Sequence, residues 1–107
     1  MNTQYIKILK DLKTLLCGHF EDDIHKVILF GSRSRDSAQP DSDYDILIVL
    51  NRDYDWRKEN NILRTCYEID LKYDILTDVK MISLSDLHSI KGKQPFIINA
   101  INEGITV

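Results

Sequence analysis

A glycine–serine pair and two closely spaced carboxylates are the residues of this 107-residue chain whose types and spacing could do chemistry. Gly31 and Ser32 follow one apolar run, and Asp43 and Asp45 lead into another. Glycine lets the backbone approach a ligand closely, and free N–H groups beside a serine hydroxyl suit a phosphate. Side chains two residues apart on a strand share one face, about 6.6 Å apart along the chain, so the carboxylates suit a divalent cation. Together these features suggest transfer of a nucleotide from a metal-bound triphosphate.

The apolar periodicity predicts the elements that must position these residues. The unbroken apolar run 46–50 indicates a strand that is covered on both faces, as in an α/β sheet. The predicted fold class is therefore α/β, a small mixed sheet of three to four strands with helices packed against it, in one domain over residues 1–107. We expect helices over residues 3–20, from Asp53 or Asp55 to about 72, and over 95–102, strands over 26–30, 44–50 and 75–82, a short helical turn from Ser83 or Ser85, an edge strand at 105–107, and a short helix or loop over 32–42.

The buried face of the second expected helix, which ends at about residue 72, can be predicted from its apolar residues. Its hydrophobic residues recur at roughly helical spacing between charged ones, which is typical of an amphipathic helix. The side chains expected to face the core are those of Trp56, Ile62, Leu63, Cys66, Tyr67 and Ile69.

The run Gly31-Ser32-Arg33-Ser34-Arg35, followed by Ser42-Asp43-Tyr44-Asp45-Ile46-Leu47, resembles the signature of the polymerase-β-type nucleotidyltransferase superfamily. The short chain is similar to its smallest members, the minimal nucleotidyltransferase (MNT) proteins. This resemblance implies a polymerase-β-like core in which Gly31 and Ser32 hold the triphosphate of ATP. It also implies that Asp43 and Asp45 bind Mg²⁺, with two ions in the site. Guanidinium geometry also suits phosphate, so Arg33 and Arg35 either neutralise the nucleotide or form a solvated loop pair.

The resemblance also implies a third acidic residue on the following strand, often the base for the attacking hydroxyl. Asp78 lies within the expected strand 75–82, whereas Asp74 lies at the turn that precedes it. We favour Asp78 as the third catalytic and metal-binding carboxylate, with Asp74 as the alternative. Lys80 shares a strand face with Asp78 by parity, and either an ion pair or a phosphate contact would explain it.

The same resemblance implies a protein partner. MNT proteins are commonly paired with a small helical HEPN toxin, and some act as the antitoxin by attaching AMP to a tyrosine of that toxin. The first hypothesis is therefore a protein adenylyltransferase. The second hypothesis is a catalytically weak module that neutralises a toxin by contact. It is motivated by the negative charge of Asp36 beside the phosphate loop and by the short chain. A third is nucleotidyl transfer to a small molecule or an RNA end.

Composition narrows the partners and the compartment. The net charge is −3 and the isoelectric point about 5.5, which argues against a broad nucleic-acid surface. The N-terminus lacks a signal-peptide pattern, and no apolar run approaches the roughly 20 residues that span a membrane. We therefore expect a cytoplasmic protein, with two cysteines that stay reduced and with self-association left open.

Overall fold

A four-stranded mixed sheet with helices on both faces forms the protein, in a computed structural model that describes residues 4–31, 43–89 and 93–107. The strand order is β3-β2-β1-β4, with β1 antiparallel to β2 and β4, and β2 parallel to β3. This confirms the predicted fold class. The elements are α1 (Gln4–Phe20), the 3₁₀ helix η1 (Glu21–Asp23), β1 (Ile24–Phe30), β2 (Tyr44–Leu50), α2 (Trp56–Tyr73), β3 (Thr77–Ser83), α3 (Leu84–Leu87), α4 (Pro95–Glu103) and β4 (Ile105–Thr106).

Local capping sets the ends of α2 where the sequence predicted them. The carboxylate of Asp55 accepts a hydrogen bond of 3.0 Å from the backbone N–H of Lys58, which satisfies one of the free donors of the first turn. At the other end Asp74 has φ +54° and donates its N–H to the carbonyl of Asp70, which is a left-handed helix stop. Asp74 therefore has a clear structural role at the end of α2.

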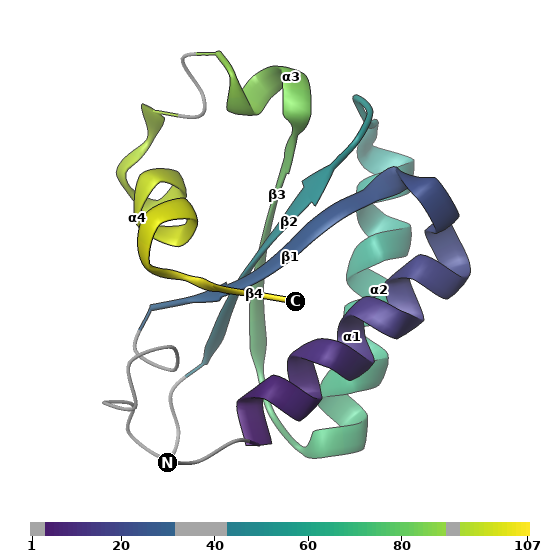
Figure 1. Ribbon diagram of the computed structural model, residues 1–107. Coiled ribbons are helices and arrows are strands. Elements are labelled where there is room, and N and C mark those ends of the chain that lie inside the picture. The colour runs from purple at the N-terminus through teal and green to yellow at the C-terminus, as the bar shows by residue number, and fades with distance from the viewer. Residues whose placement is uncertain (1–3, 32–42, 90–92) are drawn as a thin grey trace.

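The sheet separates two layers of buried apolar side chains. Figure 1 shows the helices on its two faces. Helices α1 and α2 cover one face and α4 covers the other. Alternate side chains of β2 serve the two layers: Ile46 and Ile48 pack in the core beneath α1 and α2, while Leu47 and Val49 pack with Ile97 of α4. The expectation that the run 46–50 is covered on both faces is confirmed.

The predicted buried face of α2 was half wrong. Ile62, Cys66 and Ile69 are buried, but Trp56, Leu63 and Tyr67 are exposed. Successive helical residues are 100° apart, and the sheet and α1 cover only the stripe that carries the buried residues. The exposed side chains, with Leu71, therefore line the outer side of the helix.

A polar clamp fixes α1 against α2. The carboxylate of Asp11 accepts hydrogen bonds from the hydroxyl of Tyr73 and, at 3.2 Å, from Nζ of Lys72. The Tyr73 hydrogen bond is the main reason that the pKa of Asp11 lies below its ordinary value, and Lys72 lowers this pKa further.

Within the described part of the chain, no helix is both long and apolar enough to cross a membrane.

Candidate active site

Two of the predicted carboxylates lie side by side at one end of the sheet. Asp45, the second residue of β2, is in register with Asp78 of β3 and with Phe30 of β1. Paired residues on neighbouring strands point to the same face, and Asp45 has the parity of Leu47, so Asp45 and Asp78 lie on the face that α4 covers. Asp43 precedes β2 with the same parity and is exposed. The topology therefore gathers three carboxylates that are 2 and 33 residues apart in sequence.

Gly31 leaves the room that the Asp45 carboxylate occupies. It ends β1 with φ +76°, a conformation that L side chains rarely adopt. A β-carbon at this position would overlap Oδ2 of Asp45 and lie 3.2 Å from its Cγ. The glycine is thus required twice, by the backbone turn and by the close approach of a candidate metal ligand.

The carboxylates repel one another in this arrangement. Partial burial of Asp45 raises the pKa of its carboxyl group, and the negative charges of Asp78 and then Asp43 raise it further. Lys80 acts in the opposite direction on Asp45. Unbalanced negative charge at a half-buried site is relieved by a cation, which is the electrostatic signature of a candidate functional site.

Lys80 lies at the centre of this charge balance. Its Nζ is 3.3 Å from a carboxylate oxygen of Asp78 and 6.0 Å from the ring centroid of Phe96 in the first turn of α4. The sequence left an ion pair or a phosphate contact open for Lys80, and the structure shows the ion pair. Phe96 was missed, because no local pattern places the start of α4 beside β3.

The remaining predicted residues are placed as follows. Ser32, Arg33 and Arg35 lie outside the described residues. Asp74 caps α2, as described above. In the described portion of the chain, no three acidic, histidine or cysteine side chains converge closely enough to hold a metal ion. The donor chemistry nevertheless fits Mg²⁺, because Asp43, Asp45 and Asp78 offer only carboxylate oxygens around one end of the sheet.

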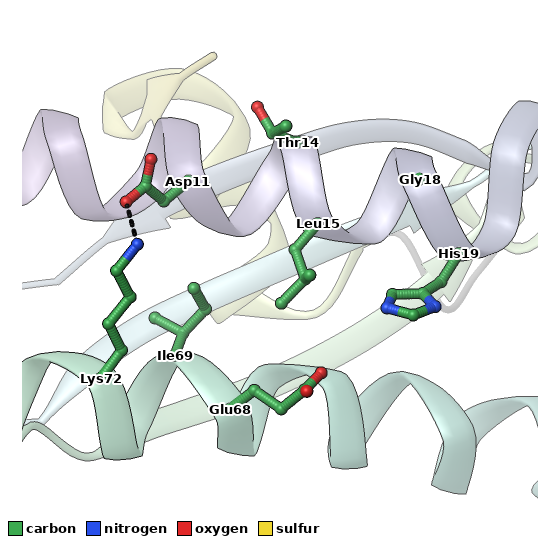
Figure 2. A pocket seen from close by; sticks show the side chains of 8 residues that line it. All are labelled: Asp11, Thr14, Leu15, Gly18, His19, Glu68, Ile69 and Lys72. Carbon is green, nitrogen blue, oxygen red and sulfur yellow. Dashed lines mark hydrogen bonds and ion pairs between the residues drawn. The ribbon is translucent and has the colours of Figure 1, made fainter.

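A large surface groove lies away from these carboxylates, between α1 and α2 (Figure 2). It has a volume of about 590 Å³, with Leu15 and Ile69 between the helices and the Asp11–Lys72 ion pair across it. Because α1 and α2 cover the sheet face opposite the carboxylates, this groove is not part of the candidate active site.

The mixed sheet and its helices form the core expected of a nucleotidyltransferase. Residues 10–107 match the family described as Polymerase beta, Nucleotidyltransferase, and the chain belongs to that family. It is 33% identical over 73 residues to MJ0141 of Methanocaldococcus jannaschii, covering 68% of this chain and 74% of that protein. It is 31% identical over 98 residues to MJ0604 of the same organism, covering 92% of each. Both relatives are named protein adenylyltransferases.

Solved structures share the fold. A crystal structure of a mutant of the toxin–antitoxin MntA-HpeT superposes with a TM-score of 0.58 at 15% identity, covering 91% of this chain and 69% of that one. A crystal structure of the toxin–antitoxin with AMP-PNP gives a TM-score of 0.59 at 17% identity, with the same coverage. The family match and the two relatives confirm the expected family and enzyme class, and the solved structures agree with the expected fold: the protein is a nucleotidyltransferase.

Proposed function

We propose that this nucleotidyltransferase transfers AMP from ATP to a hydroxyl group of a partner protein and acts as the antitoxin of a toxin–antitoxin pair. The observation that carries the proposal is the register of Asp45 with Asp78 beside the positive-φ Gly31. Two relatives named protein adenylyltransferases support the acceptor class, and neighbours crystallised as toxin–antitoxin complexes, one with AMP-PNP, support the partner and the nucleotide. The partner we propose is a HEPN-type toxin modified on a tyrosine, in the cytoplasm.

Each residue has a distinct role in this proposal. Asp43, Asp45 and Asp78 would hold Mg²⁺, which supplies charge neutralisation for the triphosphate and the leaving group. Gly31 and Ser32, with Arg33 and Arg35, would bind the phosphates. Asp78 also suits the base that accepts the proton of the attacking hydroxyl, since its side chain is about half-exposed. The α-phosphorus–oxygen bond to pyrophosphate breaks as the bond to the acceptor oxygen forms.

A second candidate is a module that neutralises the toxin by contact alone. The observation that favours it is the ion pair between Lys80 and Asp78, which occupies one carboxylate of the set. On this hypothesis a variant without the carboxylates would still bind and protect.

Transfer of an α-phosphate label tests the first candidate. The purified protein is incubated with cell lysate, Mg²⁺ and each nucleoside triphosphate labelled at the α-phosphate, with an EDTA control. Asp43→Asn is expected to lower labelling of a protein band by about two orders of magnitude or more, as loss of one group that stabilises developing charge does in other enzymes. Asp78→Asn is expected to lower it similarly.

Asp74→Asn is the matched control. Asparagine tolerates the left-handed conformation at position 74, so this variant removes the carboxylate of the residue that caps α2 without disturbing the helix stop. It is expected to label like the wild type. Full activity in a folded Asp43→Asn protein would overturn the proposal, and absence of label from a folded wild type that still protects against the toxin would favour neutralisation by contact. Label on RNA or a small molecule instead would identify a different acceptor.

A further inference from the structure

Lys80 is paired with one of two carboxylates that are in register on neighbouring strands. Lys58 and Lys72 also combine an ion pair with an aromatic contact, so the second carboxylate is the feature that distinguishes Lys80. Lys80 lies two residues beyond Asp78 on the same face of β3, with its ammonium group 3.3 Å from that carboxylate. The aromatic ring of Phe96 lies 6.0 Å from the same nitrogen, within the range of a cation–π contact. Its charge also acts on Asp45 in the neighbouring strand.

An ordinary surface ion pair explains only part of this arrangement. An exposed Lys–Asp pair contributes about 0–1 kcal/mol and needs no second carboxylate. Here Asp78 is in register with Asp45, so the single ammonium group balances negative charge from two adjacent strands. Any divalent cation that binds Asp78 would compete with Lys80 for the same oxygens.

We propose that Lys80 is a positioning residue that exchanges partners, holding Asp78 in the metal-free site and contacting the triphosphate once a metal ion has taken Asp78. This inference rests on the proposed nucleotidyl transfer. The ammonium group sits on a flexible four-carbon stem and is an effective point charge for phosphate. The side chain is about half-exposed, so it has room to move from the carboxylate to the nucleotide.

If Lys80 exchanges partners in this way, its removal should change the affinities for a metal ion and for a nucleotide in opposite directions. Without nucleotide, Lys80→Gln should bind Mn²⁺ about two- to fivefold more tightly than the wild type, because a competitor of the size of a surface ion pair has been removed. With Mg²⁺ present, the same variant should bind AMP-PNP about two- to fivefold more weakly, because a phosphate contact is lost. Free Mn²⁺ is counted by electron paramagnetic resonance, and AMP-PNP binding is measured by calorimetry.

Lys10→Gln and Lys80→Arg are the matched variants. Lys10 is exposed on α1, away from the carboxylates, so Lys10→Gln makes the same change in net charge and is expected to leave both affinities unchanged. Lys80→Arg keeps the positive charge and is expected to return both affinities toward wild-type values. If Lys80→Arg binds both ligands like the wild type while Lys80→Gln does not, then the positive charge, and not the packing of the side chain on Phe96, causes the effect.

Other outcomes overturn the exchange. If Lys80→Gln resembles Lys10→Gln for both ligands, Lys80 is only a surface ion pair. If both affinities fall in Lys80→Gln, the lysine supports the carboxylates and does not compete for them. Asp45→Asn separates this inference from the proposed function. If the wild type binds Mn²⁺ and Asp45→Asn weakens that binding, the metal site stands whatever the Lys80 variants do. If the folded wild type binds neither Mn²⁺ nor AMP-PNP, both the exchange and the proposed function are overturned.

Discussion

At the scale of single residues, Gly31 joins backbone conformation to the chemistry of the site. Its positive φ ends β1, and its missing side chain admits the carboxylate of Asp45. Gly31→Ala is therefore expected to destabilise the fold by about 1–2 kcal/mol through backbone strain. It should also displace the Asp45 carboxylate and lower transfer activity more than its loss of stability explains. Urea unfolding and the labelling assay measure the two effects.

Gly18 provides the matched control for this substitution. It lies inside α1, and a β-carbon there would meet no atom within 4 Å. Gly18→Ala is expected to stabilise the protein by about 0.5–1 kcal/mol, because alanine loses less backbone entropy than glycine in a helix. If the two alanine variants had the same effect on stability, the conformational argument for Gly31 would be wrong.

At the scale of elements, α2 tests which side of a helix the core uses. Ile62 is fully buried and its neighbour Leu63 is 39% exposed. Ile62→Ala is expected to cost about 2–5 kcal/mol, because it removes buried methyl groups and leaves a cavity. Leu63→Ala should cost less than about 1 kcal/mol. Chemical denaturation of both variants measures the difference, and similar losses would mean that Leu63 packs in the core.

The boundaries of the elements could be predicted because local chemistry sets them. Asp55 and Asp74 cap α2 through contacts within four residues, and Pro95 at the first position of α4 has its φ preset for a helix. The buried face of α2 could not be predicted as well, because apolar residues such as Leu63 and Tyr67 stand at helical spacing on the outer side too. Only the position of the sheet decides between the two sides.

The candidate site shows the same division between local and distant information. The Gly-Ser and Asp-x-Asp spacing predicted Asp43 and Asp45 from one short segment, and strand parity placed Lys80 with Asp78. The register of Asp45 with Asp78 depends on the right length of crossover through α2, which no local pattern gives. The approach of Phe96 to Lys80 depends on how α4 docks on the sheet, so no pattern in the sequence could predict it.

At the scale of the whole molecule, β2 links the stability of the protein to its site. Its last five residues are fully buried between the two apolar layers. Asp45 near its start and Asp43 just before it lie at the same end of the sheet as Asp78, so like charges meet there. The apolar layers can hold the carboxylates together because burial of the strand outweighs their repulsion. The expected consequence is a site that lowers the free energy of unfolding at neutral pH.

Asp45→Asn tests this cost through its pH dependence. The folded-state pKa of Asp45 is raised, so between its ordinary value of 3.8 and that raised value the folded protein holds a proton that the unfolded chain has released. The stability of the wild type therefore falls as the pH rises through this window, and Asp45→Asn does not share the fall. In EDTA the variant is expected to be more stable than the wild type at pH 7, with the gain vanishing below pH 3.8.

Asp11→Asn should behave oppositely, because hydrogen bonds from Tyr73 and Lys72 lower the pKa of Asp11. Its loss of stability should be present at pH 7 and disappear in acid. Thermal unfolding across this pH range measures both variants, and a loss of stability in Asp45→Asn at pH 7 would show that the carboxylate is a structural group and not a strained ligand.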